Sequence, residues 1–362
     1  MKIAFIGALT GLGGIQRTTS VVASALATSH HITYIDYRGD DSFRYSLHDT
    51  ISQYDISTVR NRGSLMNNRD KLRDKYSNEI ETLVNLLSNI DIAIFCGSFC
   101  TALIPPIKAK LAHLQTIAWQ KSSYENYITT YTEKYRDEYL LGMSLANAAV
   151  CLSPSDISGF STLNHNTFCI SNPLGLVGSE QHDPYANTFL YLGRNKIETK
   201  GLDLLIEAFI SLNSEWKLHI AVDQITPQLK QLCASEKIIL STCDSDADII
   251  QYYMSSSVYI SSSRWEGFGV TMLEAMSFGL PVVATPTVGA KHILNAGEYG
   301  LITNSFSPAD IKHIMDLISN DNTLRQELSN MSLQRYKDFS INSILLQWED
   351  ILNESFNVYK GL

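Results

Sequence analysis

Two glutamates stand eight residues apart in the segment RWEGFGVTMLEAMSFGLPVVATP, residues 264–286. The segment predicts a loop followed by a helix that ends at Gly279, so Glu266 lies in the loop and Glu274 one turn inside the helix. Because carboxylates only accept hydrogen bonds, both could hold a ligand that offers vicinal hydroxyls, such as ribose or a hexose. The alternative is a solvated Glu266 and a Glu274 that favours the helix dipole, which leaves the glycine-aromatic-glycine spacing unexplained.

The turn between the glutamates would leave backbone N–H groups open to anionic oxygens, because the first N–H groups of a helix have no acceptor within it. The amides concerned are those of Gly267, Phe268, Gly269, Val270 and Thr271. Phosphate oxygens on these amides and hydroxyls on the two carboxylates together indicate a sugar nucleotide.

Two cations precede this segment in LGRNKIETKGLDLLIEAF, residues 192–209. Arg194 follows a predicted strand and Lys200 stands at a helix start, which places both at the carboxyl edge of a parallel sheet, where ligands bind in open α/β folds. A guanidinium and an ammonium in this position suit a pyrophosphate group. The alternative is a pair of exposed loop charges.

A glycine-rich turn, GALTGLGGIQR at residues 7–17, follows the first predicted strand and opens a helix. Gly13 and Gly14 would let an anion approach the helix N-terminus. A dinucleotide fingerprint is incomplete, because the third glycine position, counted from Gly11 and Gly13, falls on Gln16. Asp36 nevertheless stands where a ribose-binding acid would lie, so an NAD-dependent oxidoreductase and a ligand-free turn both remain open.

The sequence Asp244-Ser245-Asp246 is superficially similar to the DxD metal motif of some glycosyltransferases. It directly precedes the predicted helical segment ADIIQYYM, where acidic residues cap and stabilise a helix N-terminus. We interpret it as a cap and predict no metal site.

Short apolar runs alternate with amphipathic segments along the chain, which predicts an α/β fold of two parallel sheets covered by helices. The predicted strands lie at 2–9, 31–37, 90–97, 114–120, 148–153, 167–172, 188–194, 217–222, 237–242, 257–263, 281–286 and 300–304. The pattern restarts after the join at 171–175, where a proline favours an extended hinge. We predict a Rossmann-like domain over 1–172, a second over 173–340, and a final helix over 341–362 that packs on the first domain through Trp348.

The net charge of −9 is unevenly distributed, since residues 1–172 hold 15 basic and 15 acidic residues and residues 173–362 hold 13 and 22. An acidic second half argues against a nucleic-acid binder. No apolar run is long enough for a bilayer span, and six scattered cysteines indicate a reducing, cytoplasmic setting. The basic stretch 60–75 could touch anionic headgroups at the inner membrane face, or could be a solvated helix face.

Together the three glycine-rich or charged motifs resemble retaining glycosyltransferases of family 4, which have the GT-B fold of two facing Rossmann-like domains. The resemblance rests on GGIQR at 13–17, Gly193-Arg194 with Lys200-Gly201, and the two glutamates within EGFGVTMLEAMSFGLPVVAT. It implies transfer of a hexose or N-acetylhexosamine from a nucleotide sugar, a UDP sugar above all, to a saccharide or lipid-linked acceptor in bacterial surface glycan synthesis. It implies no cofactor besides this co-substrate, an acceptor on the first domain, and a homo-oligomer or partner chain as an open question.

The resemblance also implies a role for each motif residue. Arg194 and Lys200 would neutralise the leaving diphosphate, and Glu274 would hold the ribose. The amides of 267–269 and Glu266 would hold the transferred sugar, while Gly13 and Gly14 would form a loop closing over the donor.

One position departs from the family pattern. Where the family commonly has a histidine after the strand TIAWQ, this sequence places Lys121. A lysine could supply positive charge near the reacting centre, and it also opens the alternative of a catalytically silent GT-B protein that binds glycans or stabilises a partner enzyme.

Overall fold

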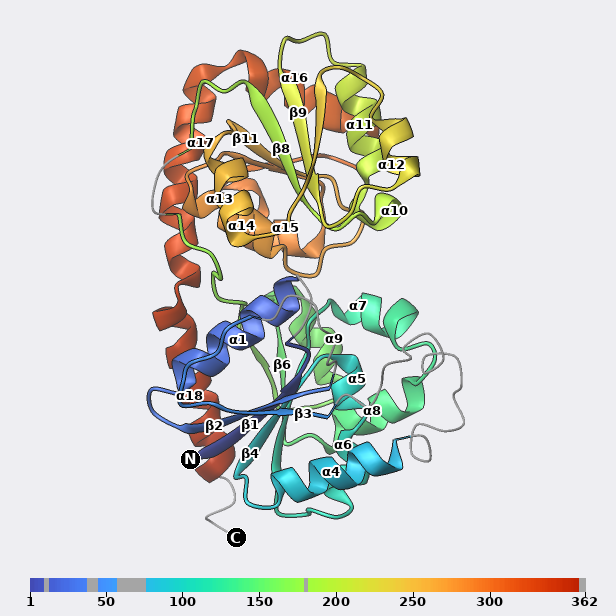
Figure 1. Cartoon of the computed structure of the whole chain (residues 1–362), viewed down its shortest axis with the longest axis vertical. Coiled ribbons are helices and arrows are strands. Elements are labelled where there is room, and N and C mark those ends of the chain that lie inside the picture. Colours follow the sequence, from blue (N-terminus) through green and yellow to red (C-terminus); the bar gives the residue numbers. More distant parts are fainter. Residues whose placement is uncertain (10–12, 38–44, 57–75, 179–181, 358–362) are drawn as a thin grey trace. The chain divides into compact units, whose positions relative to one another are not determined.

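The computed structural model describes residues 1–9, 13–37, 45–56, 76–178 and 182–357. The chain divides into two compact units, Met1–Pro173 with Ile341–Leu362, and Leu174–Ser340, which we call unit 1 and unit 2. Each unit consists of a parallel sheet with helices packed against it (Figure 1). The sequence predicted domain boundaries after residues 172 and 340, and the structure has the boundaries between the units after Pro173 and Ser340.

Unit 1 contains a seven-stranded sheet of order β3-β2-β1-β4-β5-β6-β7. Its strands are β1 (Lys2–Gly7), β2 (His31–Asp36), β3 (Ser52–Asp55), β4 (Ile92–Cys96), β5 (Gln115–Trp119), β6 (Ala148–Cys151) and β7 (Thr167–Cys169). The central strands β4 and β5 are buried along their whole length, as apolar runs in a sheet covered on both faces should be. Edge strand β3 was not predicted, because all four of its side chains are exposed and its sequence SQYD carries no buried face.

The helices of unit 1 stand between these strands in sequence. They are α1 (Gly14–Leu26), α4 (Ser77–Leu87), α5 (Ser98–Thr101), α6 (Ile104–Lys108), α7 (Tyr124–Asn126), α8 (Arg136–Leu145) and α9 (Ile157–Ser161), with short turns of other helix types at Tyr127–Tyr131 and Pro154–Asp156.

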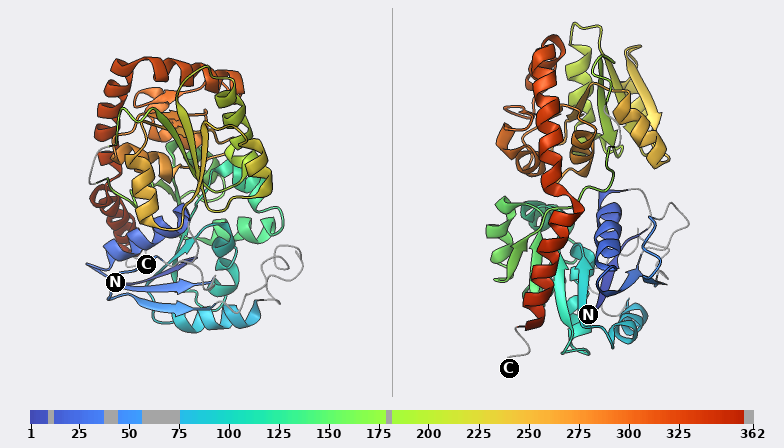
Figure 2. Two further views of the ribbon diagram at one scale, coloured as in Figure 1. Left: turned by 45° about the horizontal axis from the view of Figure 1, so that its top comes forward. Right: turned by 90° about the vertical axis from the view of Figure 1, so that its left-hand side faces the viewer.

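The C-terminal helix α18 (Ile341–Asn357) belongs to unit 1 and runs along it (Figure 2). It contacts α1 and buries Trp348 completely, with the indole 4.8 Å from that of Trp119 in an edge-to-face arrangement. His30 Nε2 lies 2.9 Å from a carboxylate oxygen of Glu349. The predicted apolar face of this helix is therefore the face that packs, with Ile344, Ile351 and Leu352 buried beside the tryptophan.

Unit 2 contains a six-stranded sheet of order β10-β9-β8-β11-β12-β13. Its strands are β8 (Thr188–Gly193), β9 (Lys217–Val222), β10 (Ile238–Thr242), β11 (Val258–Ser261), β12 (Val282–Ala284) and β13 (Leu301–Ile302). Strands β8 and β11 are paired neighbours although about 65 residues separate them in sequence, so the loops that follow them meet at one edge of the sheet.

Helices cover both faces of the unit 2 sheet (Figure 1). They are α10 (Ile197–Lys200), α11 (Leu202–Ile210), α12 (Pro227–Leu232), α13 (Asp246–Met254), α14 (Val270–Ser277), α15 (Val288–Ile293), α16 (Pro308–Asn320) and α17 (Asn322–Arg335), with single turns at Asn295–Gly297 and Tyr336–Phe339. Helix α11 packs with α16, and α14 packs with α17. Within the described residues, no helix has the length and apolar character that a bilayer crossing requires.

Candidate functional site at the carboxyl edge of unit 2

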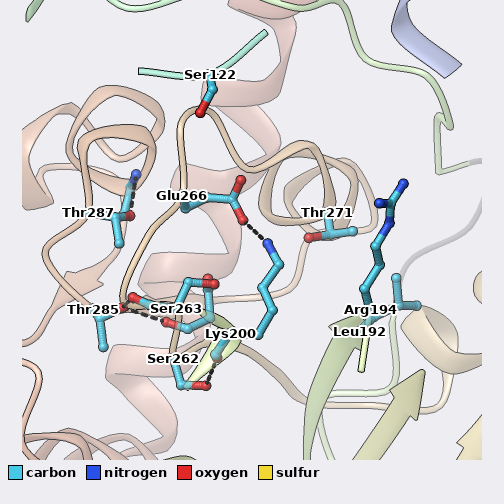
Figure 3. Close-up of polar contacts among 12 residues, drawn as sticks. Ser122, Leu192, Arg194, Lys200, Ser262, Ser263, Glu266, Thr271, Thr285 and Thr287 are labelled. Atoms are coloured by element: carbon cyan, nitrogen blue, oxygen red, sulfur yellow. Dashed lines mark hydrogen bonds and ion pairs between the residues drawn. The ribbon is translucent and has the colours of Figure 1, made fainter. Parts of the chain in front are cut away.

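Lys200 and Glu266 form an ion pair at the carboxyl edge of unit 2 (Figure 3). Lys200 ends the short helix α10 rather than starting a helix as predicted, because the left-handed Gly201 separates it from α11. Glu266 lies in the loop after β11, and the ammonium nitrogen is 2.5 Å from carboxylate Oε2. The two side chains keep 23% and 19% of their surface exposed. The structure thus brings together two predicted site residues and leaves both accessible to a ligand.

The loop after β11 is fastened to the α10–α11 turn by several hydrogen bonds. Ser262 donates its hydroxyl to the Lys200 carbonyl at 2.9 Å, and Arg264 makes two hydrogen bonds of 2.8 and 2.7 Å to the carboxylate of Asp203. These contacts hold the pKa of Asp203 below its usual range. Gly201 has φ +61°, and a side chain there would collide with the Ser262 carbonyl, so a glycine is required where the two segments cross.

Glu274 lies on the second turn of α14 and is almost fully buried, with 3% of its surface exposed. Its Oε2 accepts a hydrogen bond of 3.2 Å from the hydroxyl of Tyr253. A surface carboxylate that merely favours a helix dipole would be solvated, so this burial favours a specific role for Glu274.

Gly269 begins α14 with φ +92°, a conformation that strongly favours glycine. A side chain there would meet Met272 and would approach Glu266 Cγ to 3.3 Å. The half-buried Gly267, Val270 and Thr271 surround this helix start, whose first N–H groups have no acceptor within the helix.

Phe268, the aromatic residue between the two glycines, points into unit 2. Its ring is 3% exposed and lies 5.8 Å from the ring of His292 and 5.9 Å from that of Phe339. Burial, with the nearby Arg335, lowers the pKa of His292 to about 4, so this imidazole is neutral at physiological pH. The Phe268 ring anchors the turn, which leaves its backbone rather than its side chain available to a ligand.

Arg194 directly follows β8 and its side chain is exposed. In Figure 3 the side chains of Arg194 and Lys200 extend from the sheet edge in the same direction. Both cations therefore lie at the carboxyl edge of the sheet, as the sequence predicted, and their binding of a ligand stays a prediction.

Gly13 and Gly14 lie at the start of α1 in unit 1, where Gly13 is half-buried and Gly14 exposed. The hydroxyl of Tyr45 accepts a hydrogen bond from Gly13 N–H at 3.4 Å. Asp36 is 2% exposed and its carboxylate accepts the N–H of Leu9 at 3.3 Å, so it holds the strand-to-helix turn from inside. A dinucleotide ribose would need that carboxylate at the surface. Gly11 and the basic stretch 60–75 lie outside the described residues.

Lys121 occupies a different environment from the other predicted cations. It is 8% exposed, and its ammonium donates to Thr18 Oγ1 at 3.3 Å and to Asn172 Oδ1 at 3.2 Å. The same nitrogen lies 2.9 Å from the centre of the Trp119 ring. Burial holds the pKa of this lysine well below its usual range. The structure thus directs the Lys121 ammonium into unit 1.

The predicted cap of α13 is present, but its acceptor is Ser245, which accepts the N–H of Asp248 at 3.2 Å, while Asp246 and Asp248 lie in the first turn. Asp244 accepts the hydroxyl of Thr242 at 2.9 Å, so this aspartate takes part in local structure.

Sequence reasoning missed three hydroxyl groups beneath the unit 2 site, those of Tyr191, Tyr253 and Tyr259. In sequence they occupy apolar positions of strands or helices, where an aromatic residue predicts only packing. The sequence gives no sign of the hydrogen bonds of Tyr253 and Tyr259, because their partners come from other segments, whereas Tyr191 bonds to Arg194 just after its own strand.

Known proteins resemble this chain in sequence and in fold. Residues 178–335 match the family model described as glycosyl transferases group 1. An N-acetyl-D-galactosaminyltransferase of Campylobacter jejuni, which acts on a GalNAc-containing diNAcBac-PP-undecaprenol, is 23% identical over 99% of both chains.

Solved structures of the same architecture cover nearly the whole chain. Sucrose-phosphate synthase from Thermosynechococcus elongatus has a TM-score of 0.79 at 15% identity over 99% of this chain and 100% of its own. HepE of Anabaena, solved with UDP and glucose, has a TM-score of 0.75 at 14% identity over 98% of this chain and 100% of its own. These structural likenesses show the GT-B fold. Residues 178–335, less than half of the chain, are thus similar to glycosyl transferases group 1, and the whole chain has the GT-B fold.

Proposed function

We propose that this protein is a retaining, family 4 glycosyltransferase that moves a hexose or N-acetylhexosamine from a UDP sugar to a saccharide or lipid-linked saccharide in bacterial surface glycan synthesis. The observation that carries the proposal is the Lys200–Glu266 pair beside the start of α14 and the buried Glu274. HepE was solved with UDP, and the Campylobacter relative acts on an undecaprenol-linked glycan, which supports the donor base and the acceptor class.

Different residues at this edge of unit 2 would bind the ribose, the diphosphate and the sugar of the donor. Glu274 accepts hydrogen bonds from the ribose hydroxyls, because a buried carboxylate can only accept. The amides at the start of α14, with Arg194 and Lys200, bind the diphosphate oxygens. Glu266 and the amides of 267–269 hold hydroxyls of the transferred sugar. Lys200 pairs with Glu266, so the two side chains together suit a ligand that carries both phosphate and hydroxyl groups.

The chemical step needs charge neutralisation more than a general base. The bond between the anomeric carbon and the diphosphate oxygen breaks, and Arg194 and Lys200 stabilise the negative charge on the departing diphosphate. The acceptor hydroxyl attacks the oxocarbenium-like carbon from the same face, and its proton passes to the departing phosphate. The two cations supply the positive charge, so the scheme requires no metal ion.

Unit 1 would supply the acceptor site and, through Gly13 and Gly14, a loop that closes over the donor. Lys121 is left out of the proposed donor set, because its ammonium is buried against Trp119 and bound to Thr18 and Asn172. We assign this lysine to the packing of unit 1. Work at the inner membrane face, beside a lipid-linked acceptor, is part of the same proposal.

The test is product analysis with the purified chain, an undecaprenyl-diphosphate-linked saccharide and a panel of UDP sugars. We expect release of UDP with one or a few α-linked donors, and a product whose new bond is α by proton NMR. A β-linked product would overturn the retaining mechanism. Equal UDP release by a Lys200→Ala variant would overturn the assignment of the site.

A further inference from the structure

Three tyrosine hydroxyls lie in the interior of unit 2, beneath the proposed donor site. Tyr191 comes from β8, Tyr253 from α13 and Tyr259 from β11, and they are 2%, 0% and 1% exposed. The rings of Tyr253 and Tyr259 are 6.3 Å apart, and Tyr253 stacks on Phe278 at 5.0 Å. Buried hydroxyls need hydrogen-bond acceptors, so the position of each acceptor decides what the tyrosine does.

Each hydroxyl donates to a residue of the proposed donor set or to its direct neighbour. Tyr253 lies 3.2 Å from Glu274 Oε2 and 3.1 Å from the carbonyl of Thr271. Tyr259 lies 2.7 Å from Thr271 Oγ1, its shorter contact, and 3.2 Å from the Leu192 carbonyl. Tyr191 donates to the Arg194 carbonyl at 3.2 Å.

The surroundings of these hydroxyls fit their role as hydrogen-bond donors. A side chain at Gly193 would approach the Tyr191 oxygen to 2.8 Å, so glycine is needed beside Arg194. Burial and the negative charges of Glu266 and Glu274 raise the pKa of Tyr259, which keeps its hydroxyl protonated and able to donate.

We propose that Tyr253 and Tyr259 are positioning residues for two different parts of the donor: Tyr253 orients the Glu274 carboxylate toward the ribose, and Tyr259 orients the Thr271 hydroxyl at the start of α14 toward the diphosphate. Tyr191 fixes the backbone of Arg194 in the same way. The inference rests on the proposed function, because it assigns the tyrosines through the ligand groups that Glu274 and Thr271 are proposed to bind.

The separation of the two roles makes a sharp test possible. Tyr253→Phe and Tyr259→Phe keep the packed ring and remove only the hydroxyl. Calorimetry would measure the Kd of UDP and of 2′,3′-dideoxy-UDP, which lacks the ribose hydroxyls. In the wild type we expect UDP to bind at least about tenfold more tightly than the dideoxy ligand, the discrimination expected of hydrogen bonds to a charged group.

Tyr253→Phe should reduce that discrimination to about threefold or less, while Tyr259→Phe should keep the discrimination and weaken both ligands by about five- to tenfold. Glu274→Gln tests the same step without changing the tyrosine. It should lose the discrimination, and adding Tyr253→Phe to it should cause no further loss, because the two residues act through one contact.

Tyr252→Phe is the matched control. Tyr252 stands next to Tyr253 on α13, but its hydroxyl donates to the Thr242 carbonyl at 2.8 Å and its ring packs on His219. Removing it should leave both Kd values unchanged.

The inference would be overturned if Tyr253→Phe still preferred UDP over the dideoxy ligand as strongly as the wild type does. It would also be overturned if Tyr252→Phe lost that preference to the same extent as Tyr253→Phe. Either result would leave the proposed function intact. Failure of the wild type to bind UDP, GDP or ADP would overturn the proposed function, and the inference with it.

Discussion

Each unit of the protein carries a lysine near the carboxyl edge of its parallel sheet, and the two lysines have opposite surroundings. Lys200 in unit 2 pairs with the carboxylate of Glu266 and stays partly exposed. Lys121 in unit 1 is buried, and the groups that contact its ammonium are the neutral Thr18, Asn172 and Trp119. Residue type and place in the fold are therefore not enough to identify a ligand-binding cation.

The difference has a physical cause. A cation that binds phosphate must be reachable, and Lys200 lies beside the carboxylate of Glu266 and stays partly exposed. A lysine enclosed by neutral groups loses hydration, so its charged form becomes less favourable and its contribution shifts to packing and hydrogen bonding. Substitution of Lys200 should therefore lower activity with little change in stability, whereas substitution of Lys121 should lower stability with little change in ligand binding.

The largest effect is expected from Lys200→Ala. Loss of the ammonium should lower kcat/KM for sugar transfer by about 100-fold or more, because a charge that stabilises the leaving diphosphate is removed. Stability should change by only about 1 kcal/mol, since the ion pair is partly exposed. Steady-state kinetics and denaturant unfolding of the same preparation would measure both.

Lys121→Ala should show the reverse. Its loss leaves a cavity beside Trp119 and removes the donor that Thr18 and Asn172 accept from, so the free energy of unfolding should fall by about 2–4 kcal/mol. The Kd for UDP should stay within about twofold of the wild type, because ligand affinity and packing are separable here. If Lys121→Ala weakened UDP binding without lowering the free energy of unfolding, Lys121 would have to be assigned to the donor site instead.

The pH dependence of stability should also distinguish Lys121. Burial lowers its pKa in the folded protein, so the unfolded chain binds more protons between that lowered pKa and about 10.5. The charged form penalises folding at lower pH, and the penalty is relieved as pH rises. The stability of the wild type relative to Lys121→Met should therefore increase with pH across this window. Parallel unfolding curves for the two proteins would contradict the lowered pKa.

The smallest effect on donor binding is expected from a change in the contact that holds the loop after β11 in unit 2. Asp203→Asn weakens the double hydrogen bond to Arg264 that ties the loop of Glu266 to α11. Because the pair is partly exposed, we expect a loss of about 0.5–1 kcal/mol in stability and a rise of about two- to threefold in the KM for the donor. Arg335, which pairs with the more exposed Asp338, offers a matched control in Asp338→Asn, where the KM should not change.

Much of the fold could be predicted from the sequence, because the strands of parallel sheets are continuous apolar runs. The prediction failed at β3, whose exposed residues carry no such pattern. The packing face of α18 was also readable, since Ile344, Trp348 and Leu352 recur at helical spacing.

The candidate site was only partly readable. Its members could be named from motifs, but the contact between Lys200 and Glu266 joins residues 66 apart and depends on the pairing of β8 with β11. The burial of Lys121 depends on α1 and on Asn172, which are distant in sequence. Local patterns carry no information on such tertiary contacts, and the same limit hid the tyrosine hydroxyls.

We propose that the carboxyl edge of unit 2 binds a nucleotide-sugar donor through Lys200 and its neighbours. Calorimetric titration of UDP into the wild type, Lys200→Ala and Lys121→Ala would test this proposal. We expect saturable binding to the wild type, at least about tenfold weaker binding to Lys200→Ala, and nearly unchanged binding to Lys121→Ala. Equal affinity of the wild type and Lys200→Ala, or no binding of UDP, GDP or ADP to the wild type, would contradict it.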